Sequence, residues 1–119
     1  MRHAYAPYSE FRVGAALLCD DGAIVPGCNV ESSSFPAGMC AERGALAAAV
    51  ATGHRQFTRL LIVTEAEEAT PPCGVCRQAL VEFSASLEIA SLTTSGATAR
   101  WTLAELLPHP FTPSSLRHQ

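Results

Sequence analysis

The chain contains no lysine: all eight of its basic residues are arginines, and they are scattered along the 119 positions. The formal net charge is -3. Proteins that bind nucleic acid usually gather basic side chains on one face, because contacts to phosphate dominate their affinity. The sequence shows no basic cluster or stripe, so we expect no nucleic-acid partner.

Long apolar runs are also missing. No stretch approaches the roughly 20 residues of a membrane span, and the start MRHAYAPYSEF has no apolar run of signal-peptide length. We therefore expect no membrane partner and a cytoplasmic location. The five cysteines are an odd number, and in a reducing compartment such cysteines indicate metal binding or catalysis before disulfides.

Repeats, low-complexity tracts and linkers are absent from the sequence. Hydrophobic residues make up 48% of the chain and charged residues 16%, which is ample material for a core and excludes a disordered chain. A chain of this length buries about two-thirds of its unfolded surface. We expect one domain over residues 1–119.

Strands and helices alternate along the sequence. Apolar runs predict strands at residues 13–19, 24–30, 60–64 and 87–93, with a weak fifth strand near residues 99 and 100. An alanine-rich segment stopped by Gly53 predicts a helix over residues 39–52, and a second helix is expected over residues 74–83. Thr102 and Glu105 form a capping box before a short last helix. This alternation predicts a layered α/β domain.

Two short motifs carry the chemistry, and each opens a predicted helix: Cys40-Ala41-Glu42-Arg43 and Pro72-Cys73-Gly74-Val75-Cys76-Arg77-Gln78. Two helix N-termini meeting end-on would place three thiolates around one metal ion, and their positive ends favour the thiolate form. Arg43 and Arg77 could donate hydrogen bonds to sulfur. Three protein ligands leave the fourth tetrahedral position open, as in catalytic zinc sites.

Two other interpretations of these cysteines stay open. A structural zinc site would take Cys19, Cys28 or a histidine as its fourth ligand, although Cys19 and Cys28 lie in apolar strand runs where inert thiols are common. A redox C-x-x-C pair is the other alternative, but it leaves Cys40 and Glu42 unexplained.

The two motifs match the signature of the zinc deaminases, in which His or Cys, any residue and Glu are followed by Pro-Cys-x-x-Cys. The chain closely resembles the homotetrameric, all-cysteine cytidine deaminases of nucleoside salvage from about residue 5 to residue 111. The matching stretches are AYAPYSEFRVGAALL, GCNVES, CAER, PCGVCRQ and LAELLP. The resemblance implies a three-layer α/β/α domain with a mixed five-stranded sheet. It also implies zinc-dependent hydrolysis of cytidine, deoxycytidine or both to (deoxy)uridine and ammonia in pyrimidine salvage.

The resemblance also implies roles for particular residues. Zn²⁺ would be held by Cys40, Cys73 and Cys76. Glu42 would move protons between water, the pyrimidine ring and the departing amine, and Arg43 would support the ligand sulfurs. The expected nucleoside contacts are Asn29 and Glu31 on the ribose, Phe11 against the nucleoside, and Phe35 and Phe111 at subunit boundaries.

The working enzyme would then be a homotetramer with active sites shared between chains. Packing within the chain's own core or loops is the alternative role for the aromatic residues. Rival functions are a blasticidin-S-type or other small-molecule aminopyrimidine deaminase, a polynucleotide-editing deaminase and a non-enzymatic structural zinc module. The sequence does not rank cytidine against deoxycytidine.

Overall fold

The computed structural model describes residues 1–34 and 38–111. They form a five-stranded sheet of order β2-β1-β3-β4-β5 with three helices. The elements are β1 Val13–Cys19, β2 Ile24–Cys28, α1 Ala41–Ala51, β3 Phe57–Thr64, α2 Gly74–Val81, β4 Glu88–Thr93, β5 Thr98–Thr102 and α3 Leu103–Leu106. Only β3 and β4 pair in parallel in this sheet, and the other three pairings are antiparallel. The predicted mixed five-stranded α/β fold is confirmed.

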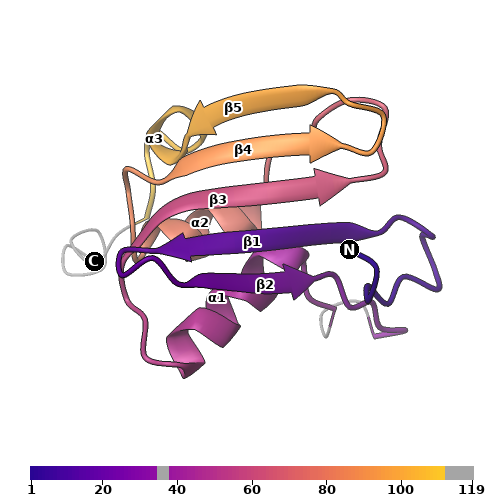
Figure 1. Ribbon diagram of the computed structural model, residues 1–119, viewed down its shortest axis with the longest axis horizontal. Coiled ribbons are helices and arrows are strands. Elements are labelled where there is room, and N and C mark those ends of the chain that lie inside the picture. The colour runs from indigo at the N-terminus through magenta and orange to yellow at the C-terminus, as the bar shows by residue number, and fades with distance from the viewer. Residues whose placement is uncertain (35–37, 112–119) are drawn as a thin grey trace.

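Strand direction brings the two longer helices to the same edge of the sheet. β1 runs antiparallel to both β2 and β3, so β2 and β3 point the same way. Their arrowheads lie together at one end in Figure 1. α1 follows β2 and α2 follows β3, and both helices therefore begin near that edge. Ligands in α/β sheets bind at the carboxyl ends of strands for this reason.

α1 and α2 lie behind the sheet in Figure 1, on the same face. α1 packs across β1, β2 and β3. In the described part of the chain, no helix lies over the opposite face of the sheet, so the described residues supply one of the two helical layers of the predicted three-layer α/β/α domain. The core between helices and sheet includes Leu17, Leu60, Ile62, Leu80 and Ile89, each at most 2% exposed.

The alanine stripe of α1 allows a very close approach to β2. Ala41, Ala45 and Ala49 recur every four residues and are fully buried, as one face of a helix requires. Opposite them, a Cβ added at Gly27 would lie 2.4 Å from the Ala45 nitrogen and 2.5 Å from the Ala41 carbonyl oxygen. Glycine at this position therefore sets the distance between α1 and the sheet.

The predicted element ends shift by a few residues. The second strand stops at Cys28 because Val30 leaves the ladder and forms isolated bridges with Tyr5 and Met39. α1 consequently begins after Cys40 rather than at residue 39. β3 begins earlier than predicted, at Phe57, and the weak fifth strand is real. The capping box is confirmed, with the Glu105 N–H donating to the Thr102 hydroxyl.

Within residues 1–34 and 38–111, no helix is both long enough and apolar enough to cross a lipid bilayer.

Candidate active site

Three cysteines from the two motifs meet at the helix N-termini. Cys40 is the N-cap residue of α1, Cys73 is the N-cap residue of α2, and Cys76 lies in the first turn of α2. The Sγ atoms of Cys40 and Cys73 are 3.8 Å apart, and those of Cys73 and Cys76 are 3.3 Å apart. Zinc–sulfur bonds of about 2.3 Å at tetrahedral angles place two sulfurs roughly 3.8 Å apart. The spacing of these sulfurs fits a zinc ion.

The charges of the cluster also suit a cation. Burial, followed by the negative charge of Glu42, raises the pKa of the Cys76 thiol. Burial acts in the same direction on Cys73, but hydrogen bonds from Cys76 and Cys40 together outweigh it and lower the pKa of the Cys73 thiol. Three sulfurs this close, beside a carboxyl group, do not all ionise unless a positive charge compensates them. The two helix N-termini supply part of that charge, and a divalent metal would supply the rest.

Glu42 stands in the first turn of α1, two residues after Cys40, and is 6% exposed. Burial raises the pKa of its carboxyl, opposed by a hydrogen bond from its own backbone, by Cys76 and by the charge of Arg43. A carboxyl whose pKa lies above its ordinary value is suited to accept and return a proton near neutral pH. The structure thus places a candidate proton carrier beside the candidate metal ligands.

The two arginines that follow the motifs have different partners. Arg43 directs its Nη2 toward the Cys40 sulfur at 3.9 Å, as expected from the sequence. Arg77 instead donates to two backbone carbonyl oxygens, Pro72 at 2.8 Å and Leu106 at 3.0 Å. The expectation that Arg77 supports the ligand sulfurs is therefore wrong. Its guanidinium joins the start of α2 to the end of α3.

A cavity of about 530 Å³ adjoins the cluster, within the roughly 300–1,000 Å³ typical of small-molecule sites. Its walls include Tyr8, Ser9, Asn29, Glu31, Cys40 and Arg43. Sequence reasoning picked out Asn29, Glu31, Cys40 and Arg43 but missed Tyr8 and Ser9. A signal was present for the missed pair, since both lie in the AYAPYSEF stretch that carries the resemblance.

Asn29 and Glu31 organise the segment that closes this cavity. The Asn29 amide accepts from the Val13 N–H at 3.0 Å and donates to the Phe11 carbonyl at 2.9 Å. Glu31 accepts from the Tyr8 and Ser9 backbone N–H groups at 3.0 and 3.1 Å, and also from the Ser9 hydroxyl. The hydrogen bond from the Ser9 side chain, followed by that from its backbone, lowers the pKa of Glu31.

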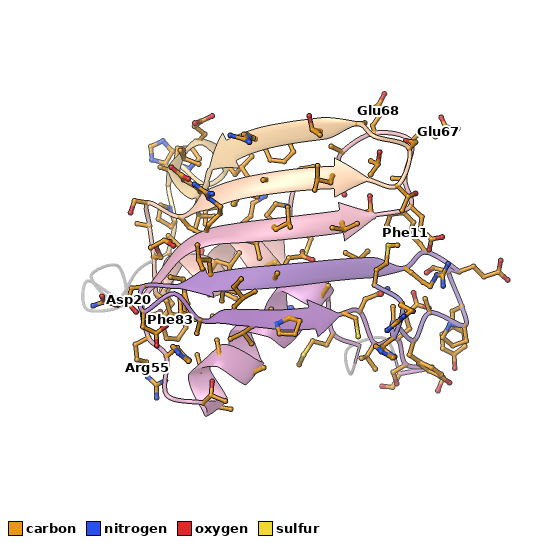
Figure 2. All side chains as sticks on the ribbon, viewed as in Figure 1. Phe11, Asp20, Arg55, Glu67, Glu68 and Phe83 are labelled. Atoms are coloured by element: carbon orange, nitrogen blue, oxygen red, sulfur yellow. The ribbon has the colours of Figure 1, made fainter. Side chains whose placement is uncertain are left out.

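The aromatic residues are more dispersed. Phe11 lies at the end of the sheet where β1 begins (Figure 2), and the residue is about one-third exposed. It does not belong to the cavity wall, although its carbonyl oxygen holds Asn29. Phe35 lies outside the described residues. Phe111 is 48% exposed, and the Gln78 side chain holds its backbone N–H and carbonyl.

Gln78 is a site-adjacent residue that sequence reasoning did not find. It lies two residues after Cys76 on α2, while its partner Phe111 is 33 positions further along the chain. Local patterns carry no information about a pair at that separation. The motif containing Gln78, PCGVCRQ, was its only signal.

Three clustered cysteines and a buried carboxyl at paired helix N-termini, beside a small-molecule cavity, define a candidate metal-dependent hydrolytic enzyme. Residues 1–91 match the family described as the cytidine and deoxycytidylate deaminase zinc-binding region. The chain belongs to this family.

Individual relatives agree with this assignment. A cytidine deaminase of Sporosarcina psychrophila is 43% identical over 116 residues, covering 97% of this chain and 85% of the relative. The crystal structure of a cytidine deaminase from Burkholderia pseudomallei is 42% identical with a TM-score of 0.89, covering 92% of this chain and 89% of that one. The cytidine deaminase structure from Mycobacterium tuberculosis is 40% identical with a TM-score of 0.79, covering 92% and 86%.

Proposed function

We propose that this chain is a zinc-dependent enzyme that hydrolyses the exocyclic amine of cytidine, deoxycytidine or both, in pyrimidine salvage. The observation that carries the proposal is the meeting of Cys40, Cys73 and Cys76 with the buried Glu42. Relatives named cytidine deaminase that match nearly the whole chain support the substrate class. All five cysteines are free thiols, which suits a reducing compartment such as the cytoplasm.

The three cysteines would hold the zinc ion, with Arg43 donating a hydrogen bond to Cys40. When bound, zinc lowers the pKa of water so that hydroxide is available near neutral pH. Glu42 takes a proton from the attacking water and delivers it to N3 of the pyrimidine as oxygen adds to C4. Glu42 then carries the second proton of that water to the exocyclic nitrogen, which leaves as ammonia. The base becomes uracil. Overall, one cytidine-type nucleoside and one water give one uridine-type nucleoside and one ammonia.

Asn29 and Glu31 would recognise the ribose. Both line the cavity that contains Cys40. Each already binds backbone groups of residues 8–13, so their positions are fixed before a nucleoside arrives, which lowers the entropy lost on binding. The remaining lone pairs of the Glu31 carboxylate and the second Asn29 N–H are the groups available to sugar hydroxyls.

The substrate assignment is tested by assaying cytidine, deoxycytidine, cytosine and blasticidin S side by side. We expect the nucleosides to be deaminated much faster than free cytosine. Asn29→Ala and Glu31→Ala should each lower kcat/KM for cytidine at least about tenfold, the scale of one lost polar contact. Glu68→Ala, on the loop after β3 in Figure 2, is the control. Equal turnover of cytosine and cytidine, or a preference for blasticidin S, would reject the ribose-binding role.

We further propose a homotetramer whose sites are shared between subunits, with Phe111 entering a neighbouring site. Support comes from the half-exposed Phe111 ring on a backbone that Gln78 holds next to the Cys76 turn. Phe35 lies outside the described residues, and its place at a subunit boundary stays a prediction. Mixed oligomers of Phe111→Ala and Glu42→Gln subunits should regain activity, because some sites then combine both native residues. A fully active monomer, or no rescue after demonstrated subunit exchange, would contradict sharing.

A further inference from the structure

A second group of metal-binding side chains lies at the other end of α1 from the three-cysteine cluster. Cys19 ends β1, Asp21 follows in the turn to β2, and His54 follows the C-terminus of α1. Their sulfur, carboxylate and imidazole ligand atoms all lie within 4.8 Å of one another. Asp20 and Arg55, their chain neighbours, mark this end of the molecule in Figure 2, far from Phe11. The Asp20 N–H donates to the Gln56 carbonyl and holds the turn against the loop.

Thr52 sets the orientation of the His54 ring. The Thr52 hydroxyl lies 3.1 and 3.0 Å from the carbonyl oxygens of Ala48 and Ala49, to which it donates its single proton. The Thr52 oxygen also lies 3.2 Å from Nδ1 of His54, where it can accept from the Nδ1–H tautomer of the ring. Nε2 then faces the Asp21 carboxylate at 3.0 Å. In the tautomer that carries its proton on Nδ1, Nε2 has a free lone pair, so Nε2 and the Asp21 carboxylate then offer two donor atoms to a metal ion.

A hydrogen bond from Nδ1–H to the Thr52 oxygen is of the kind that orients metal-bound histidines, whose second nitrogen donates to an oxygen. Cys19 supplies the third donor from a strand residue that is 2% exposed. Burial, followed by the charges of Asp21 and Asp20, raises the pKa of the Cys19 thiol. A bound cation would reverse this balance and favour the thiolate.

The size of the cluster is close to that of a metal site. Bonds of about 2.0–2.3 Å at tetrahedral angles place donor atoms roughly 3.3–3.8 Å apart. Nε2 and the carboxylate oxygen, now 3.0 Å apart, would separate by a few tenths of an ångström, and the sulfur lies within 4.8 Å of both. Asp21 can adjust because its side chain is 58% exposed on a turn, whereas that of His54 is 19% exposed.

We propose that Cys19, Asp21 and His54 form a second metal site, which binds a zinc-class transition metal ion. One sulfur, one nitrogen and one oxygen donor suit zinc or cobalt and do not suit magnesium or calcium. The ion would fasten the β1–β2 turn to the end of α1, while the first turn of that helix carries Glu42. Its role is to hold the helix in place, and it has no part in the reaction.

Cobalt(II) tests this site in the folded protein that already holds one equivalent of zinc. We expect a further equivalent of cobalt to bind and to give a near-ultraviolet thiolate-to-cobalt absorption band. His54→Gln should weaken this binding at least about tenfold, and His109→Gln, a change at an exposed histidine, should leave it unchanged. Cobalt at 100 times its Kd should also lower the unfolding equilibrium constant about 100-fold.

Two results would overturn the proposal. Zinc-loaded wild-type protein that binds no cobalt would show that His54 and Asp21 form an ion pair only. A cobalt band that persists in His54→Gln and in Cys19→Ala would place the metal among Cys40, Cys73 and Cys76. Because Cys19 is in the core and its variant can fail to fold, His54→Gln decides the matter alone if Cys19→Ala is unstable.

Discussion

The two ends of α1 carry clusters of opposite character. At the N-terminal end, three sulfurs and the buried Glu42 form an anion-rich group beside a cavity. At the C-terminal end, Cys19, Asp21 and His54 bring a sulfur, a carboxylate oxygen and an imidazole nitrogen within 4.8 Å of one another. The positive helix end stabilises thiolates and the negative end stabilises cations. One helix therefore supports both arrangements, but only the first end combines candidate metal ligands with a buried proton carrier and space for a substrate.

The largest expected effect is a loss of turnover when Glu42, at the N-terminal end of α1, is changed. Glu42→Gln removes the proposed proton carrier and should lower kcat about 10²–10⁴-fold, while zinc content and fold are kept. Glu68→Gln, on the exposed loop after β3, is the matched control and should keep full activity. Activity is measured by ammonia release and zinc by elemental analysis. Near wild-type turnover in Glu42→Gln would assign the proton transfers to another group.

The two arginines after the motifs sharpen the distinction between site and scaffold. Arg43→Ala removes the hydrogen bond to Cys40 and should weaken zinc affinity about 10–100-fold, the usual effect of losing a group that supports a ligand. Arg77→Ala leaves two backbone carbonyls without their donor and should instead destabilise the fold by roughly 1–3 kcal/mol.

Zinc competition with a chelator and denaturant unfolding distinguish these outcomes. Equal losses of zinc affinity in the two variants would reject the assignment of Arg43 to the metal site and of Arg77 to the fold.

The scaffold shared by both clusters is the close contact between α1 and β2. Gly27→Ala introduces a Cβ within 2.5 Å of two backbone atoms of α1 and should destabilise the fold by roughly 1–3 kcal/mol. Gly44→Ala, on the α1 side of the same contact, is the matched control, since its Cβ would lie 3.4 Å from the Cys28 carbonyl oxygen. Alanine there should raise stability by up to about 1 kcal/mol. Thermal unfolding measures both, and a neutral Gly27→Ala would show that α1 can shift freely.

The smallest effect concerns acid titration at the cavity end. Hydrogen bonds from the Ser9 hydroxyl and then from the Ser9 backbone N–H lower the pKa of Glu31. Since the folded pKa is depressed, Glu31 stabilises the fold above its unfolded pKa, and this contribution disappears as pH falls through the folded value. Ser9→Ala should move the Glu31 pKa upward in an NMR titration. The pKa of Glu65, which Arg12 lowers, should stay unchanged, and a Glu31 pKa that does not move would reject the Ser9 contact.

How much the sequence reveals follows from the range of each interaction. Cys40 and Glu42 are two residues apart at a helix start, so their proximity is a local property that the motif predicts. Cys40 meets Cys73 because β2 and β3 point in the same direction on either side of β1, so the helices that follow them begin at the same edge of the sheet. An alternation of strands and helices favours that arrangement.

Long-range contacts were beyond the sequence. The His54–Asp21 and Gln78–Phe111 pairs are each separated by 33 positions, and no periodicity reports such pairs. The two arginines show the same limit, because each directly follows a cysteine motif at a helix start, yet their side chains have different partners. Element ends moved where isolated bridges, such as that between Val30 and Met39, replaced the ladder.

Zinc-edge X-ray absorption on protein loaded with one equivalent of zinc tests the central claim most directly. If Cys40, Cys73 and Cys76 hold the catalytic ion, the spectrum should show three sulfur ligands at about 2.3 Å and one oxygen or nitrogen ligand at about 2.0 Å. The spectrum should be the same in His54→Gln. Four sulfur ligands, or one sulfur with nitrogen and oxygen ligands that His54→Gln removes, would contradict an open catalytic zinc site at the helix N-termini.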